Sequence, residues 1–296
     1  MHEPVLLGEV VRLLEPKPGQ TILDGTVGLG GHAAAILPRI APHGRYLGLD
    51  LDPRMLEQAA ARLAPPADVT LELIEANFAD LPVLLSQRGI EAVDAMLLDL
   101  GVNSAQLADP QRGFSFEHEG PLDMRFSPQQ REQAVELVNR LSERELADLF
   151  YHYGQERQSR KIARAICAAR RSGRIRTTRA LARIVESAVG GRRGRIHPAT
   201  RVFQALRIAV NRELENLDRF LDACFTHLRP GGRVAVISFH SLEDKRVKRA
   251  FREAARAGVA RVRTPRPVTP DADEIRRNPR SRSAKLRVAE RMSNEE

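Results

Sequence analysis

The first hundred residues of the chain alternate short apolar runs with segments whose apolar residues recur at helical spacing. Four apolar runs are expected to form strands: Thr21–Asp24, Arg45–Asp50, Val69–Glu75 and Ala92–Leu98. Helical spacing is found over Pro4–Leu14, His32–Ile40, Pro53–Leu63 and Asp80–Arg88. Strands that alternate with helices predict a mostly parallel α/β sheet, with a ligand site beyond the carboxyl ends of the strands.

The alternation stops after Leu100, where turn-forming residues lead into helical patterns that run from Gln129 to Val189. Strand character returns at Arg233–Ser238, after a turn signal at Pro230–Gly232. The remaining expected elements are a helix over Leu242–Ala257, strands over Ala260–Thr264 and Ala284–Ala289, and an extended loop over Thr264–Pro279. We therefore predict a sheet domain of residues 1–106 and 213–296, interrupted by a helical substrate-recognition domain of residues 107–212.

A glycine-rich turn, DGTVGLGGH from Asp24 to His32, joins the first expected strand to the next helix. Glycine lets the backbone approach a ligand closely, but such a turn also suits a tight connection without any ligand. Asp50, at the end of the second strand, adds a carboxylate that can accept hydrogen bonds from both hydroxyls of a ribose. Together the two features favour a nucleoside cofactor.

The charge at this turn separates two nucleoside cofactors that bind with similar geometry. A carboxylate such as that of Asp24 is unfavourable beside a pyrophosphate and favourable beside the ammonium and sulfonium groups of S-adenosylmethionine. The glycine spacing departs from the dinucleotide fingerprint, and no lysine follows in the Walker pattern. We predict S-adenosylmethionine; the alternative, a Rossmann dehydrogenase, is disfavoured because no hydride-transfer site is evident.

Further candidate residues follow the third and fourth strands. Phe78 is placed either to lie against an adenine ring or to plug the junction between strand and helix. Asp99, Asn103 and Ser104 follow the fourth strand, where they are expected to face the transferred methyl group. An apolar run that ends in aspartate is also a common strand end.

Basic residues are concentrated in one part of the chain. The whole sequence carries a net charge of +9, yet residues 156–195 hold thirteen basic residues against Glu156 and Glu186. That segment is therefore +11 and the remainder is −2. A solvated helix face is the plain interpretation, but the arginine excess favours a surface that contacts RNA phosphates.

Composition limits where the protein works. The sequence contains no apolar run long enough to span a membrane and begins without a signal peptide, so a cytoplasmic protein is expected. Cys167 and Cys224 lie among apolar residues, which indicates core packing rather than a disulfide or a metal site. A homodimer is compatible with the sequence.

Several long motifs resemble one family of enzymes. They are HEPVLLGE from His2, the DGTVGLGGH turn, LLDLGVNSAQL, RGFSF with GPLDMR, HPATRVFQALRIAVNREL, PGGRVAVISFHSLEDKRVK and NPRSRSAKLRVAER. These motifs extend over the chain and are similar to those of the bacterial small-subunit ribosomal RNA (cytosine-N4) methyltransferases, the RsmH/MraW family. The resemblance implies a class I S-adenosylmethionine-dependent methyltransferase fold with an inserted helical domain. Phe126 departs from the methionine expected there.

The resemblance also implies a substrate and a set of cofactor contacts. The substrate is the exocyclic N4 of a cytidine in the decoding region of 16S ribosomal RNA, in the small subunit or its precursor, at position 1402 by family convention. The cofactor contacts that it implies are Gly30, Gly31, His32, Asp50, Phe78, Asp99 and Gln106. Asp24 and Gly28 of the glycine-rich turn are predicted as further cofactor contacts.

The chemistry of an exocyclic amine suggests roles for the remaining candidates. Such an amine is a poor nucleophile, so alignment with the sulfonium and polar acceptors at the amine are expected to supply the rate. Asp99 and the Asn103–Ser104 turn are the first acceptors, followed by Ser238, His240 and the Glu243–Asp244 pair. His240 serves either as a base or only as a helix cap.

Contacts with RNA are expected from His197, Arg201, Asn211 and Ser238, together with the arginines of the insertion. Arg201 is the strongest of these candidates. Methylation at carbon-5 is disfavoured because no cysteine lies near the fourth strand. An RNA-binding protein without catalysis, and a methyltransferase for another RNA position, stay open.

Overall fold

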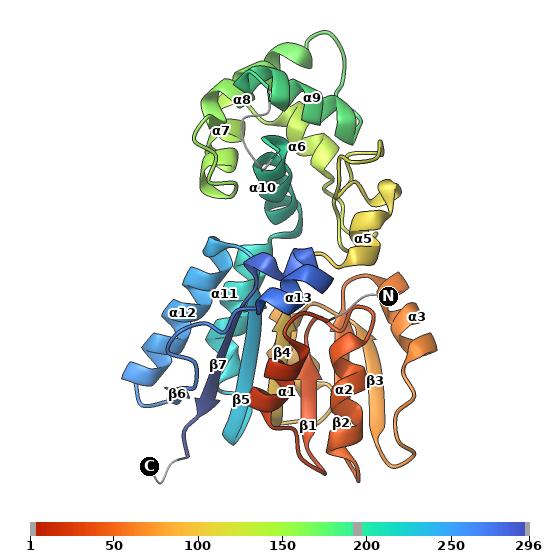
Figure 1. The fold of residues 1–296 in the computed structure, drawn as a ribbon, viewed down its shortest axis with the longest axis vertical. Helices are drawn as coiled ribbons and strands as arrows, with labels where there is room; N and C mark the ends of the chain where they lie inside the picture. The colour runs from red at the N-terminus through yellow and green to blue at the C-terminus, as the bar shows by residue number, and fades with distance from the viewer. Residues whose placement is uncertain (1–3, 192–196, 294–296) are drawn as a thin grey trace. The chain divides into compact units, whose positions relative to one another are not determined.

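The computed structural model describes residues 4–191 and 197–293. Two compact units make up the chain (Figure 1). The sheet unit comprises Met1–Gly101 and Leu214–Glu296, and the helical unit comprises Val102–Glu213. Among the described residues, no helix combines the length and apolar character needed to cross a membrane.

The sheet unit is built on seven strands in the order β3-β2-β1-β4-β5-β7-β6. The strands are β1 (Thr21–Asp24), β2 (Arg45–Asp50), β3 (Thr70–Glu75), β4 (Val93–Asp99), β5 (Leu228–Ser238), β6 (Ala260–Val262) and β7 (Lys285–Arg291). Strands β1 to β5 pair in parallel, whereas β7 runs antiparallel to β5 and β6. This topology confirms the expected mostly parallel α/β fold.

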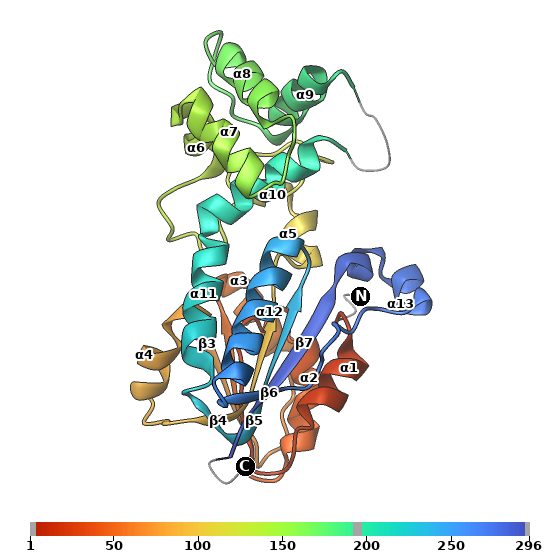
Figure 2. The same ribbon diagram turned by 90° about the vertical axis from the view of Figure 1, so that its left-hand side faces the viewer.

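Helices cover both faces of the sheet (Figure 2). They are α1 (Leu7–Leu14), α2 (Gly31–Ile40), α3 (Pro53–Arg62), α4 (Leu81–Ser86), α11 (Glu213–Cys224), α12 (Ser241–Arg256) and α13 (Ala272–Arg277). One face packs against α1 and α2 through Val10 and Ile36. The other packs against α4, α11 and α12 through Leu85, Phe220 and Phe251. Strands buried on both faces explain their nearly continuous apolar sequences.

Three parts of the sheet unit differ from the sequence-based expectation. Strand β5 begins at Leu228, and its pairing with β4 jumps from Leu228 to Arg233, so the expected turn Pro230–Gly232 is a bulge within the strand. The expected extended loop contains helix α13, which Asp271 caps through its hydrogen bond from the Glu274 amide. Helix α11 was not predicted, because a short acidic and apolar segment gives no distinctive start signal.

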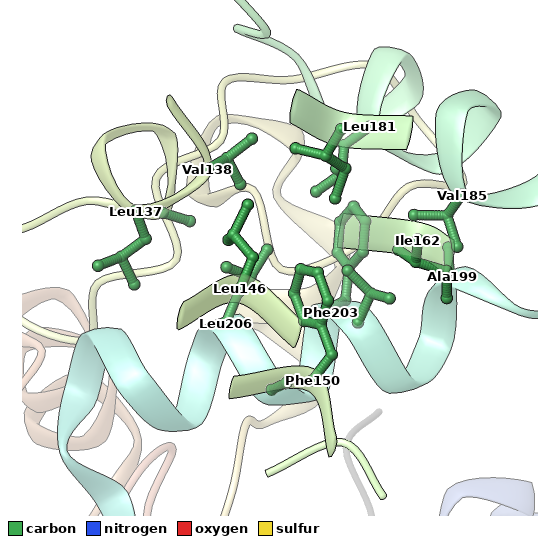
Figure 3. Close-up of a cluster of buried hydrophobic side chains, with 14 of the residues drawn as sticks. Leu137, Val138, Leu146, Phe150, Ile162, Leu181, Val185, Ala199, Phe203 and Leu206 are labelled. Carbon is green, nitrogen blue, oxygen red and sulfur yellow. The ribbon is translucent and has the colours of Figure 1, made fainter. Parts of the chain in front are cut away.

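The helical unit has a core of its own. Its helices are α5 (Ser104–Ala108), α6 (Ala134–Arg140), α7 (Glu143–His152), α8 (Ser159–Ala169), α9 (Thr178–Val189) and α10 (Ala199–Asn211). Figure 3 shows Phe150, Leu181 and Phe203 among the side chains that gather between these helices. Each such side chain contributes about 1.5–3 kcal/mol when fully buried. Cys167 lies in this core and Cys224 in that of the sheet unit, both as buried thiols.

Candidate functional site

Three aspartates end neighbouring strands at one edge of the sheet. Asp24 ends β1, Asp50 ends β2 and Asp99 ends β4. Figure 1 labels these three strands in the sheet unit. Strand β1 pairs in parallel with both β2 and β4, so the three carboxyl ends lie side by side. This edge is where an open parallel sheet forms its ligand crevice.

Backbone hydrogen bonds hold the glycine-rich turn between β2 and β4. The Gly25 amide donates to the Leu97 carbonyl at 2.9 Å, and the Val27 amide donates to the Leu49 carbonyl at 2.8 Å. Gly30 has a φ of +77°, which suits glycine, and it caps the start of α2. A Cβ on Gly25 would lie 2.4 Å from a Leu98 methyl carbon, so this glycine is needed for packing.

Hydrogen bonds tie each of the three aspartates to the turn or to the strands beside it. The Asp24 carboxylate accepts hydrogen bonds from the Thr26 amide at 3.0 Å and the Tyr46 hydroxyl at 2.8 Å. The Thr26 hydroxyl accepts from the Asp99 amide at 2.6 Å. Asp50 accepts from the Gly28 amide at 3.0 Å and the Asp52 amide at 2.9 Å. The turn is thus fixed by the residues expected to hold a cofactor.

Burial raises the pKa of each aspartate. It raises the pKa of Asp24 to about 6, although the hydrogen bond from Tyr46 opposes the change, and that of Asp50 to about 7. The pKa of Asp99 rises to about 8 because of burial and, secondarily, the charges of Asp24 and Glu243. Among the described basic side chains, His32 alone lies within ion-pair distance of any of the three. The site therefore favours a cationic ligand.

Asp99 has unused hydrogen-bonding capacity. Its Oδ1 is buried without a hydrogen-bond partner among the described residues. The Oδ2 lies 3.9 Å from Nδ1 of His32, whose Nε2 contacts the Val5 carbonyl at 3.1 Å. About a fifth of the Asp99 side chain is exposed, at 22%. A buried acceptor beside a partly open surface can receive a donor from a ligand.

Phe78 follows β3 in a short 3-10 helix, Phe78–Asp80. Its ring meets the ring of Phe220 edge to face, with centroids 5.9 Å apart. Its Cβ lies 2.8 Å from the position of a Cβ on Gly25, so Phe78 packs beside the glycine-rich turn. Both expected tasks of Phe78, plugging the junction and facing a ligand, suit this position.

The residues after β5 form a helix cap and an ion pair. His240 caps α12: its Nδ1 accepts from the Glu243 amide at 3.4 Å, and Glu243 accepts in return from the backbone amides of Phe239 and His240. Asp244 is paired with Arg287 at 2.6 Å, which holds the pKa of its carboxyl below the usual value. Ser238 is 1% exposed, and its hydroxyl donates to the Lys285 carbonyl at 3.4 Å.

Three predicted site residues belong to the start of the helical unit. Asn103 caps α5 by accepting from the Gln106 amide at 2.9 Å, and the Gln106 side chain accepts from the Asn103 amide at 3.2 Å. Ser104 is the first residue of that helix. The reciprocal caps fix the Asn103–Ser104 turn and bury Gln106, which is 5% exposed.

The predicted RNA contacts in the helical unit differ in exposure. His197 accepts from the Ala199 amide at 3.1 Å, and its ring lies against that of Phe116. Asn211 is 2% exposed and donates to the carbonyls of Met124 and Arg207. Arg201 has half of its side chain exposed and lies 3.7 Å from Glu156. RNA contact by Asn211 and Ser238 stays a prediction, although both are tied to the main chain.

The basic segment presents many cations without acidic partners. Arg192, Arg193 and Arg195 lie outside the described residues, as do His2 and Glu3 of the first motif. Of the ten described basic residues in this segment, Arg164 and Arg174 pair with Glu143 and Glu136. The others form no ion pair with any described acidic residue; they are Arg157, Arg160, Lys161, Arg170, Arg171, Arg176, Arg179 and Arg183. An exposed cationic surface of this kind suits a polyanion.

A model of one protein family matches nearly the whole chain. The model of the MraW methylase family matches residues 1–292. The chain belongs to the MraW methylase family. This membership is consistent with the glycine-rich turn and the three aspartates at the strand ends.

Relatives of the chain carry a more specific name. A protein of Thermomicrobium roseum, 50% identical, is called ribosomal RNA small subunit methyltransferase H, with 99% of this chain and 94% of that protein aligned. A protein of Halorhodospira halophila with the same name is 48% identical over the same shares. Fibrillarin of Aeropyrum pernix, solved with natively bound S-adenosyl-L-methionine, is 13% identical, with a TM-score of 0.38 over 92% of this chain and 71% of that one.

Two residues of the candidate site were not predicted from the sequence. Tyr46 is fully buried in β2 and donates to Asp24, and Thr26 joins Asp24 to the backbone of Asp99. Thr26 lies inside the glycine-rich turn, so its hydroxyl, two residues after the end of β1, could have been predicted to contact Asp24. The residue pattern of β2 could not indicate that the Tyr46 hydroxyl contacts Asp24, because that contact depends on the register between β1 and β2.

Proposed function

We propose that the sheet unit binds S-adenosylmethionine at the carboxyl ends of β1, β2 and β4. The observation that carries this proposal is a set of three aspartates, one buried and two partly buried, whose pKa values are raised and which have no basic partner among the described residues except His32. A ligand that carries an ammonium and a sulfonium group would compensate these carboxylates. A pyrophosphate would add negative charge to the same place, which disfavours the dehydrogenase alternative.

Asp50 has the geometry of a ribose acceptor. Each oxygen of its carboxylate accepts a hydrogen bond from one backbone amide, and a carboxylate has further lone pairs for two hydroxyls. We assign the methionine end of the cofactor to the neighbourhood of Asp24 and the adenine to that of Phe78. The remaining proposed cofactor contacts are Gly28, Gly30, Gly31, His32, Asp99 and Gln106.

Methyl transfer to an amine needs positioning and an acceptor for a proton. The bound cofactor supplies an electrophilic methyl group. Residues of the site would hold the exocyclic nitrogen in line with that methyl group and accept the proton that the nitrogen releases. The unpartnered Oδ1 of Asp99 can accept a hydrogen bond from the amine, with the Asn103–Ser104 turn as a second set of acceptors. His240 is the remaining candidate, although it caps α12.

The proposed substrate is N4 of a cytidine in 16S ribosomal RNA, at position 1402 by family convention. Two lines support it: the names of the relatives, which specify small-subunit ribosomal RNA, and the motif resemblance, which alone names the amine. The unpaired cations of the helical unit, with Arg201, are proposed to hold the RNA. We propose that the protein acts in the cytoplasm.

The chain's cysteines favour N4 over carbon-5 of the cytosine. Carbon-5 chemistry needs a cysteine nucleophile. Cys224 is buried, and burial raises the pKa of its thiol to about 12; Cys167 lies in the core of the helical unit. The two rivals that remain are RNA binding without catalysis and methylation at another RNA position.

One experiment tests the activity and separates it from these rivals. Small subunits that lack the modification are incubated with the protein and S-adenosylmethionine carrying a labelled methyl group. The RNA is then digested and mapped by mass spectrometry. Labelled N4-methylcytidine at one site, absent with Asp50→Ala, is the expected result. Binding without label would support the non-catalytic rival, and label at another base would overturn the substrate assignment.

A further inference from the structure

The C-terminal end of α7 and the residue that follows it expose aromatic rings. Four large hydrophobic side chains are exposed among the described residues, and two of them are Tyr151, at 58%, and Tyr153, at 36%. The next residue back, Phe150, is fully buried and points into the core of the helical unit (Figure 3). Phe150 therefore anchors this end of α7. The two tyrosines are exposed on different sides of it, because residues two apart on a helix do not face each other, and the Tyr151 ring meets the His152 ring edge to face.

Hydrogen bonds make the turn between α7 and α8 compact. The amides of Gly154 and Glu156 both donate to the Phe150 carbonyl at 3.1 Å. The Gln204 side chain of α10 donates to the Tyr153 carbonyl at 3.2 Å. A Cβ on Gly154 would lie 2.5 Å from the Arg201 carbonyl oxygen, so the turn fits tightly against α10. The exposed rings are thus held on an ordered backbone, which lowers the entropic cost of binding to them.

The same turn leads directly into exposed cations. Arg157, Arg160 and Lys161 are exposed, and none forms an ion pair with any described acidic residue. Glu156 does not compensate them, because it is buried and lies 3.7 Å from Arg201. These cations also stand at the start of α8, where the helix dipole disfavours positive charge. Helix stability therefore does not explain their position.

We propose that Tyr151 and Tyr153 form a stacking platform for unpaired bases of single-stranded RNA, and that Arg157, Arg160 and Lys161 contact its phosphates. Aromatic faces bind bases of any sequence, and flanking cations follow the backbone. A protein partner would suit the tyrosines, but it would leave three neighbouring cations to be matched by acidic residues. The proposal rests on the proposed function and extends it by giving the RNA a position on the helical unit.

The composition of the chain supplies a direct probe of this platform. The protein has three tyrosines and no tryptophan. The third tyrosine, Tyr46, is fully buried in the sheet unit and donates to Asp24. Tyrosine emission that changes when RNA binds therefore reports on Tyr151 and Tyr153.

The test compares three full-length proteins: the wild type, the double variant Y151F/Y153F and the double variant Y151L/Y153L. Each is titrated with a short unstructured oligocytidine, which is followed by anisotropy of a label on the RNA and, for the wild type, by tyrosine emission. The Leu variant is expected to bind about 10-fold more weakly, because stacking of one base contributes a factor of this size, and the Phe variant to bind like the wild type. Circular dichroism and S-adenosylmethionine affinity should be equal in all three.

Equal RNA affinity of the Leu and Phe variants, or wild-type tyrosine emission that RNA does not quench, would overturn the platform. Methylation of small subunits is measured with the same proteins. A wild type that methylates cytidine while the Leu variant keeps full RNA affinity refutes the platform and leaves the proposed function intact. A wild type that binds RNA with quenching but transfers no methyl group refutes the proposed function instead.

Discussion

Among the residues that the structure describes, the sheet unit gathers carboxyl groups at its strand ends, and the helical unit gathers cations without acidic partners. In the sheet unit, three aspartates at strand ends are buried or partly buried, and burial raises the pKa of each. In the helical unit, the cations without acidic partners are mostly exposed on helices and turns. The binding properties of a carboxylate at a strand end depend on a few hydrogen bonds in fixed positions. An exposed cation contributes to ligand binding mainly through the electrostatic potential that it shares with its neighbours. Substitutions in the sheet unit should therefore act singly and strongly, and those in the helical unit weakly and additively.

The largest effect is expected from Asp50→Ala. It removes the proposed ribose acceptor together with the partner of the Gly28 amide, so S-adenosylmethionine should bind about 100-fold more weakly by calorimetry, or about 3 kcal/mol. Asp50→Asn keeps one oxygen and should lose less. Oligocytidine affinity should stay unchanged in both variants, and a parallel loss of RNA affinity would break the separation between the units.

A packing change in the sheet unit should come next. Gly25→Ala places a methyl group 2.4 Å from Leu98 and 2.8 Å from Phe78, so we expect the free energy of unfolding to fall by about 1–3 kcal/mol in urea. Gly8→Ala is the matched control, because its Cβ would meet nothing within 4 Å inside α1. That variant should be more stable by about 0.5–1 kcal/mol. Equal destabilisation of the two variants would contradict the crowding at Gly25.

The raised pKa of Asp99 predicts a pH dependence of stability. An unfolded aspartate has a pKa of about 3.9, while Asp99 in the folded chain has a pKa of about 8. Between these values the folded state keeps a proton that the unfolded state releases, so stability falls as pH rises toward 8. The proposed Asp99→Asn variant removes this contribution and should be more stable than the wild type at pH 8.5, by about 1 kcal/mol.

Urea midpoints at pH 6 and 8.5, measured without cofactor, check this prediction. Asp50 and Asp24 have raised pKa values of about 7 and 6, so the variant should retain a smaller slope of the same sign. A wild type whose stability rises between these two pH values would contradict the burial of Asp99.

The smallest effect is expected from one exposed cation. Arg160→Gln should weaken oligocytidine binding about 3-fold at moderate salt and reduce the slope of log affinity against log salt by about 0.7. Arg164→Gln, on the same helix, is the control, because Arg164 already lies 3.5 Å from Glu143 and should affect the slope less. Cofactor affinity should be unaffected in both. Equal slopes for Arg160→Gln and the wild type would remove Arg160 from the proposed RNA surface.

Much of the sheet unit could be predicted from the sequence, because its strands are short apolar runs bounded by clear turns. The limits of β1 and β2 agree with the expectation residue for residue. The prediction of secondary structure was wrong in two segments whose residue types suit more than one conformation. Pro230–Gly232 reads as a turn but forms a bulge inside β5, and the charged Thr264–Pro279 segment contains α13.

Within the candidate site, the aspartates at the strand ends could be identified because parallel strands bring their carboxyl ends to one edge. The contacts of Tyr46 and Thr26 could not, since they depend on strand register and side-chain direction. The exposure of Tyr151 and Tyr153 was equally inaccessible, because a tyrosine at a helix end fits a core or a surface equally well.

The position of the helical unit in the chain has a consequence for how the protein folds. Strands β4 and β5 pair directly, although the whole of Val102–Glu213 lies between them in sequence. Closing so long a loop costs conformational entropy before the contacts between β4 and β5 form and offset that cost. If the helical unit folds early, the flexible loop that must close between β4 and β5 becomes shorter. The rate at which β4 and β5 pair would then depend on helices that lie outside the sheet. Core substitutions at Phe150 or Leu181 should therefore slow formation of the β4–β5 pair in refolding followed by hydrogen exchange.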